Sequence, residues 1–166
     1  MRQRMAEYIG TVEGFCVKTF RNEPAATTDD HSPSRFRPHG RVEFVKRENV
    51  LICYATGPFN VELIEAVSNV EAKLIEELVQ QGKWGDIIVL KESAMASPGT
   101  VEAFASNVKR LVAQGVMSSA TALVLSPEVE GAAFMSPLYV RAYSNVGMEL
   151  HAVSYTHLTL PTIYSV

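Results

Sequence analysis

Residues 50–81 read VLICYATGPFNVELIEAVSNVEAKLIEELVQQ and predict a strand followed by a long helix. The apolar run at 50–56 is typical of a strand, which Gly57 and Pro58 end. Asn60 then stands where a helix N-cap belongs. Apolar residues recur after it at helical spacing, with glutamates between them, until Gly82. This pattern indicates an amphipathic helix of about six turns.

Strands and helices alternate along the rest of the chain from Arg41. Residues 42–45 form a further short strand pattern, and a polar turn at 46–49 separates it from the strand at 50–56, which predicts an antiparallel hairpin. An interior proline costs a helix about 3 kcal/mol, so we expect the last helix to begin at Ser136, with Pro137 in its first turn. The elements predicted after the long helix are a buried strand at 86–90, a helix from Ser97 to Gly115, a buried strand at 120–125, a helix from Ser136 to Asn145 and a strand at 148–152.

The predicted order is therefore ββαβαβαβ, which indicates an α/β fold. Strands that alternate with helices imply parallel neighbours in one sheet. We expect a mixed sheet of about four to five strands, with the N-terminal hairpin as an antiparallel edge and with helices on both faces.

The sequence divides into three parts. Residues 1–40 are polar and proline-containing in their second half and predict a flexible leader. Residues 41–152 form the single α/β domain. Residues 153–166 resemble one reading frame of a transposase adaptor used to prepare DNA sequencing libraries, so we interpret them as a cloning scar. The domain is then expected to be incomplete at its C-terminal end, and Tyr155 and His157 belong to no site.

Composition excludes several classes of function. The net charge of −3 lacks the basic footprint of a nucleic-acid-binding protein. No apolar stretch approaches the roughly 20 residues that span a bilayer, and no signal peptide precedes the domain, so we expect a cytoplasmic protein without a transmembrane segment. Cys16 and Cys53 have no metal-binding or redox spacing, and Cys53 is expected to be a small buried hydrophobe.

Motifs for catalysis or cofactor binding are missing from the sequence. His31 and His39 lie in the leader and His151 lies beside the scar, so no Ser/His/Asp set is credible. The chain has neither a P-loop nor a dinucleotide-binding glycine fingerprint. We therefore predict no catalytic residues, no metal site and no cofactor.

A candidate binding rim consists of Lys91, Glu92, Ser93, Thr56 and Ser126, which follow strand ends. Open α/β sheets commonly bind ligands beyond the carboxyl ends of their strands. The alternative is a set of solvated loops.

Two apolar features also have two interpretations. Trp84, which precedes the strand at 86–90, either closes the core or serves as a binding platform. The segment with Phe134, Met135, Leu138, Tyr139 and Tyr143 is either core or the wall of a pocket for a lipid or small apolar ligand.

The element order, with the segments at 50–60 and 86–90, resembles the SpoIIAA-like/STAS group of bacterial proteins over roughly residues 41–152. The resemblance implies a small domain that acts by binding, such as an anti-sigma-factor antagonist or a small-ligand or lipid-associated regulator. It also implies one more strand and an amphipathic helix at the C-terminal end. In the antagonist branch a serine at a helix start is phosphorylated, and Ser97 is the matching position.

Ser97 departs from that pattern in two ways. The antagonists place an Asp-Ser pair ahead of a glycine, whereas Ala96 precedes Ser97 here, and Pro98 removes one N–H from a phosphate cradle. The alternative role of Ser97 is simply that of an N-cap.

The sequence thus favours a non-enzymatic regulatory or ligand-binding domain, whose partner is a protein or a small apolar ligand or lipid. An alternative is a small enzyme with its polar site at Lys91, Glu92 and Ser93. A homodimeric module is a third reading.

Overall fold

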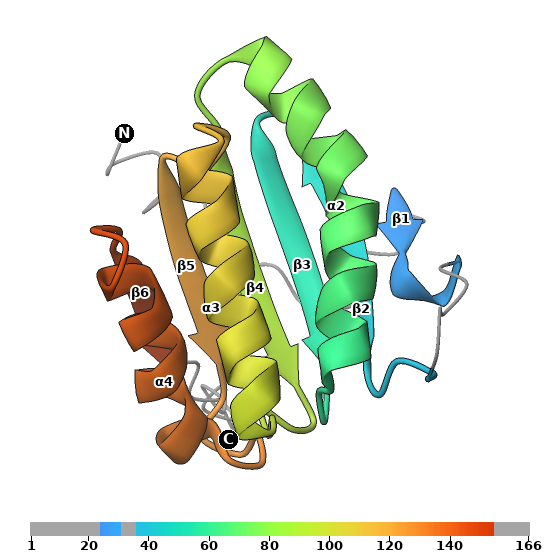
Figure 1. The fold of residues 1–166 in the computed structure, drawn as a ribbon, viewed down its shortest axis with the longest axis vertical. Helices are drawn as coiled ribbons and strands as arrows, with labels where there is room; N and C mark the ends of the chain where they lie inside the picture. The colour runs from blue at the N-terminus through green and yellow to red at the C-terminus, as the bar shows by residue number, and fades with distance from the viewer. Residues whose placement is uncertain (1–23, 31–35, 155–166) are drawn as a thin grey trace, which may run out of the picture.

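A computed structural model describes residues 24–30 and 36–154 of the chain (Figure 1). The elements are β1 (Ala26–Thr27), the short 3-10 helix η1 (Thr28–Asp30), β2 (Arg41–Arg47), β3 (Val50–Thr56), α2 (Val61–Gln81), β4 (Gly85–Lys91), α3 (Pro98–Ala113), β5 (Ala120–Leu125), α4 (Ala132–Ser144) and β6 (Leu150–Ser154).

The strands form one mixed sheet in the order β1-β2-β3-β4-β5-β6. The pairs β1–β2 and β2–β3 are antiparallel, and each later strand pairs in parallel with the one before it. The predicted α/β class and the N-terminal hairpin are therefore confirmed. The predicted number of strands is wrong, because the described sheet has six strands rather than four or five.

The additional strand, β1, lies within the segment that the sequence assigned to the leader. Ala26 pairs with Phe44, and the Oγ1 of Thr28 accepts a hydrogen bond of 3.0 Å from the backbone N–H of Val42. Arg41 forms an ion pair of 3.0 Å with Asp29. A two-residue strand carries too little periodic pattern to be recognised in a polar segment, and these long-range contacts supply its stability.

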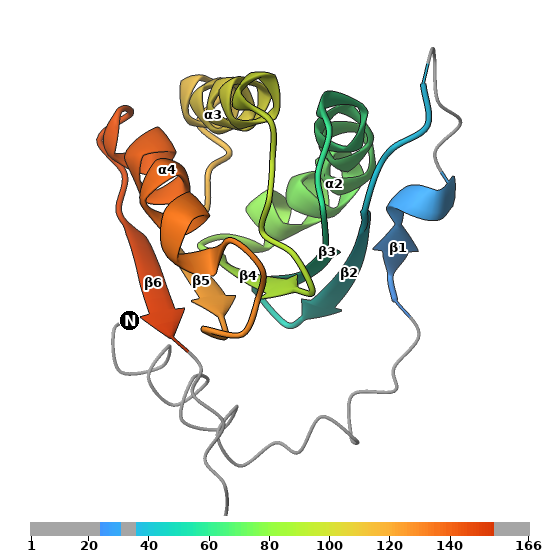
Figure 2. The same ribbon diagram turned by 90° about the horizontal axis from the view of Figure 1, so that it is seen from below.

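The three described α-helices cover one face of the sheet, so the predicted arrangement with helices on both faces is wrong (Figure 2). Each crossover from β3 to β6 carries the chain to the next strand in the same direction. Crossovers between parallel strands are right-handed in nearly all proteins. Three right-handed crossovers in one direction place all three helices on the same side, whereas helices on both faces need a strand order that reverses.

Both of the predicted caps for α2 and α3 are confirmed. The side chain of Asn60 accepts a hydrogen bond from the backbone N–H of Leu63, and that of Ser97 accepts one from Thr100. Each cap satisfies a backbone donor that has no partner within the helix.

The start of α4 differs from the prediction. The helix begins at Ala132 instead of after Ser136, and Pro137 lies inside it. Pro137 cannot donate the hydrogen bond that an ordinary residue would give to the carbonyl of Ala133. Met135 and Tyr139 are buried in the hydrophobic core, and this packing outweighs the lost hydrogen bond.

The last strand crosses the boundary of the predicted scar. Val153 and Ser154 pair with Val124 and Leu125 at the edge of the sheet. Tyr155 and His157 lie outside the described residues, and the adaptor origin of residues 153–166 stays a prediction. No helix in the described part of the chain is long and apolar enough to cross a membrane.

The packed face of α2 is tested by two neighbouring substitutions. Leu78 is fully buried, whereas Val79 is 38% exposed. We expect Leu78→Ala to lower the free energy of unfolding by about 2–5 kcal/mol, because it leaves a cavity in the core. Val79→Ala is the matched control and should cost less than about 1 kcal/mol. Urea denaturation measures both, and equal losses would contradict this orientation of α2.

Candidate ligand-binding cavity

The loops that carry the predicted rim meet at one edge of the sheet. The backbone N–H of Gly57 donates to the carbonyl of Lys91, and Ser93 forms an isolated β-bridge with Glu130. A Cβ at Gly57 would lie 2.1 Å from the carbonyl oxygen of Ser93, so only glycine allows this approach. The loops that follow β3 and β4 are therefore in direct contact.

The rim side chains make separate local contacts. The ammonium of Lys91 lies 4.4 Å from the centre of the Tyr54 ring, a cation–π contact. Ser93 is buried, and its hydroxyl accepts a hydrogen bond from the backbone N–H of Met95. Ser126 accepts one from Glu128, which is a local turn contact. Of the remaining two rim residues, Thr56 is partly buried and Glu92 is exposed; a binding role for the rim stays a prediction.

Ser97 has the geometry of an N-cap. Its hydroxyl lies 2.8 Å from the hydroxyl of Thr100 and accepts a hydrogen bond of 3.2 Å from the Thr100 backbone N–H. The residue itself is exposed, so a modifying enzyme has access to it. Phosphorylation of Ser97 stays a prediction.

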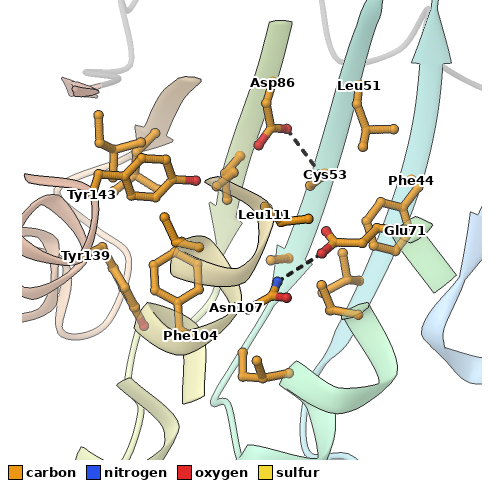
Figure 3. A pocket seen from close by; sticks show the side chains of 18 of the residues that line it. Phe44, Leu51, Cys53, Glu71, Asp86, Phe104, Asn107, Leu111, Tyr139 and Tyr143 are labelled. Atoms are coloured by element: carbon orange, nitrogen blue, oxygen red, sulfur yellow. Dashed lines mark hydrogen bonds between the residues drawn. The ribbon is translucent and has the colours of Figure 1, made fainter. Parts of the chain in front are cut away.

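A cavity of about 110 Å³ lies between the sheet and the helices (Figure 3). Its wall is contributed by β2 to β6, by the three α-helices and by neighbouring loops. Most of the lining is aliphatic or aromatic. The polar or ionisable side chains that line it are those of Cys53, Glu71, Trp84, Asp86, Thr100, Asn107, Tyr139 and Tyr143.

Two pairs of these side chains are joined by hydrogen bonds that Figure 3 shows as dashed lines. The thiol of Cys53 donates to the carboxylate of Asp86, with 3.6 Å between the two atoms. The side-chain amide of Asn107 donates to Glu71 over 2.9 Å. Arg110, which is exposed, donates in turn to the carbonyl oxygen of Asn107 over 2.6 Å. We define these two pairs together, Cys53 with Asp86 and Glu71 with Asn107, as the acidic cluster, because the charge of Glu71 acts on Asp86.

Burial shifts the protonation of this acidic cluster. Desolvation, helped by the charge of Glu71, raises the pKa of Asp86 to about 7. Desolvation also raises the pKa of Glu71, although Asn107 and Arg110 oppose the shift. The pKa of the Cys53 thiol is raised as well, mainly by burial and then by Asp86, so this thiol is protonated and unreactive at neutral pH.

Trp84 contributes a hydrogen-bond donor without a partner. The residue is 4% exposed and lines the cavity, and its Nε1 has no acceptor among the described residues. A buried donor left unpaired costs about 1–3 kcal/mol. Trp84 is therefore part of the core, and its indole N–H is an unpaired donor at the cavity wall.

The aromatic segment of α4 divides between wall and surface. Tyr139 and Tyr143 are buried and line the cavity, and the ring of Phe104 lies edge-on to Tyr139 at 5.3 Å. The hydroxyl of Tyr139 donates to the carbonyl of Ala94. Phe134, by contrast, is 69% exposed. The segment was interpreted either as core or as a pocket wall. Tyr139 and Tyr143 belong to both, because they are buried and line the cavity.

Sequence reasoning missed the acidic cluster, although signals for it were present. Glu71 falls within the apolar stripe of α2, between Val67 and Ile75 at four-residue spacing. Asp86 shares its face of β4 with Ile88 and Leu90, which also line the cavity. A charged residue at a position that the period assigns to the core is a sign of a buried polar site. Among the residues described, no group of three or more His, Cys, Asp or Glu is arranged to hold a metal ion.

Comparisons with known proteins give no relative. No protein-family model matches the chain, and neither a curated protein nor a solved structure matches it.

The raised pKa of Asp86 predicts a pH-dependent stability. Since the pKa is about 7 in the fold and about 3.9 in an unfolded chain, the folded state binds the extra proton between these values. Stability therefore falls as pH rises from about 4 to about 7. We expect the stability difference between Asp86→Asn and the wild type to grow by about 2–3 kcal/mol in favour of the variant between pH 5 and pH 8.

Denaturation at the two pH values measures this difference. Glu76→Gln is the control for replacing a carboxylate by an amide, because Glu76 is exposed on α2. Its effect on stability should not change between the two pH values. If the stability difference between Asp86→Asn and the wild type does not change with pH, the pKa of Asp86 is not raised.

Proposed function

We propose that this chain is a non-enzymatic binding domain that holds a small, largely apolar ligand between its sheet and its helices. The observation that carries the proposal is the cavity of about 110 Å³, in which a few polar groups converge within an apolar wall. Ligand sites have this composition, with apolar lining for affinity and a few polar groups for orientation.

The volume of the cavity limits the ligand. An apolar cavity of about 150 Å³ holds benzene, which has six non-hydrogen atoms. In proportion, 110 Å³ holds roughly four to five non-hydrogen atoms. The ligand is therefore a small molecule, or the terminal part of a longer one.

A relation to the SpoIIAA-like/STAS proteins is part of this proposal. The parallel β-α-β units after an antiparallel hairpin support it, as does a binding cavity in place of a catalytic set. In the same proposal Ser97 is a regulatory position, supported by its exposure and its place at the start of α3.

The alternative function, an enzyme that uses Lys91, Glu92 and Ser93, has less support. Lys91 is held over Tyr54, whereas Ser93 is buried and bonded to the backbone. None of the three lines the cavity. This alternative stays a hypothesis.

Filling the cavity tests the proposed function. Ala55 is buried on β3 and lines the cavity, so Ala55→Leu should occupy part of the space and abolish binding of small apolar probes. Saturable chemical-shift changes at Ile88 and Leu123, on titration with xenon or 1-butanol, report binding. Ala133→Leu, on the exposed surface of α4, is the control that should leave binding unchanged.

If Ala55→Leu unfolds the protein, the smaller Ala55→Val should weaken binding in a folded one. Failure of xenon, 1-butanol and n-butylamine alike to shift the cavity resonances of the wild type would refute the proposed function.

The regulatory role of Ser97 has its own test. Ser97→Glu should reduce the recovery of a co-purified partner relative to Ser97→Ala, because the added charge lies on an exposed helix start. Circular dichroism of both variants should show an intact fold. Equal recovery with the two variants would remove Ser97 as a switch.

A further inference from the structure

The cavity contains acidic groups and no base. Glu71 and Asp86 line it, and no lysine, arginine or histidine is among the described lining residues. The nearest described cation with a link to the acidic cluster is Arg110, whose guanidinium reaches Asn107 from the exposed side of α3. A buried carboxylate without a cation is costly, because its charge is removed from water without compensation.

The carboxyl groups also have unused capacity for hydrogen bonds. A carboxylate accepts up to about four hydrogen bonds. Asp86 accepts from the thiol of Cys53, a weak donor at 3.6 Å, and from the backbone N–H of Ile87. Glu71 accepts from Asn107. Within the described residues no other side-chain donor reaches either group.

The unpaired indole N–H of Trp84 is a second, independent observation in the same cavity wall. Nε1 of Trp84 is a fully buried donor in the same cavity wall, and the described part of the chain offers it no acceptor. Trp84 immediately precedes β4, and both Trp84 and Asp86 line the cavity. A molecule in the cavity therefore meets two carboxyl groups, which attract a cation, and an indole N–H, which needs an acceptor atom.

We propose that the cavity binds a small aliphatic molecule with one protonated amine, whose nitrogen lies beside the carboxyl groups of Asp86 and Glu71, and with one acceptor oxygen for the indole N–H of Trp84. This proposal rests on the proposed function and adds the chemical class of the ligand. A single positive charge fits, because the repulsion between the two carboxyl groups disfavours two negative charges in the cavity. The apolar chain of the amine contacts the surrounding aliphatic wall, including Leu63 and Leu123.

Three probes of similar size distinguish the charge of the ligand. These are n-butylamine, 1-butanol and propionate, each with about five non-hydrogen atoms, the upper end of the roughly four to five that the cavity volume allows. At pH 8 the amine is protonated, since a primary alkylamine has a pKa of about 10.4. We expect n-butylamine to bind at least about tenfold more tightly than 1-butanol, and propionate to bind least, in a titration followed by NMR.

Substitutions then assign the preference to the acidic cluster. Asp86→Asn should reduce the affinity for n-butylamine at least about tenfold and leave that for 1-butanol nearly unchanged. Glu71→Gln is the second variant, and Glu76→Gln is the exposed control. Equal binding of n-butylamine and 1-butanol, or an amine affinity unaffected by Asp86→Asn and Glu71→Gln, would overturn the amine assignment while the proposed function stands.

The amine affinity should also depend on pH. The titratable groups that face Asp86 are Cys53 on β3, Glu71 on α2 and Tyr143 on α4, and Arg110 on α3 acts on Glu71 through its charge. The thiol and the phenol are neutral from pH 5.5 to 8, because burial raises the pKa of both. Affinity for n-butylamine should therefore rise several-fold from pH 5.5 to 8 as the carboxyl groups ionise. An affinity that is constant over this range would contradict the proposal.

Discussion

The architecture depends on the direction of the three parallel crossovers. Each crossover from β3 onward adds the next strand at the same edge of the sheet, and right-handed connections then put every described α-helix on one face. That face contains Phe44, Leu51 and Leu123, which are almost fully buried. The cavity lies in this same layer, between side chains of the sheet and those of the helices (Figure 3). A doubly wound order would have divided the helices between two layers, and no single helix layer would have enclosed this space.

Burial between the sheet and the helices also affects two carboxyl groups. Glu71 is buried on α2 and Asp86 is partly buried on β4, and both line the cavity, so the packing that buries the apolar side chains also desolvates two carboxyl groups. Buried ionisable groups stabilise a fold poorly compared with apolar residues of similar size. Their presence in a cavity that also contains the unpaired donor of Trp84 supports the proposed binding function.

Local signals predicted the elements well, whereas their arrangement in space followed from long-range contacts. Asn60 and Ser97 were recognisable as caps because capping is decided within four residues of sequence. The strand β1 and the early start of α4 were not predictable, since both depend on contacts with distant residues that outweigh local preference. The rim was expected at the strand ends, but the structure places the most unusual polar groups in the interior. Cys53 was expected to be buried, and it is, but its contact with Asp86 required the register of β3 against β4.

The most direct test of the account is a crystal structure of the protein grown at pH 8 with n-butylamine. We expect one amine molecule inside the cavity, with its nitrogen within hydrogen-bonding distance of the Asp86 carboxylate and its alkyl chain against the aliphatic wall. A cavity that contains only ordered water, or an amine bound only at the molecular surface, would contradict it.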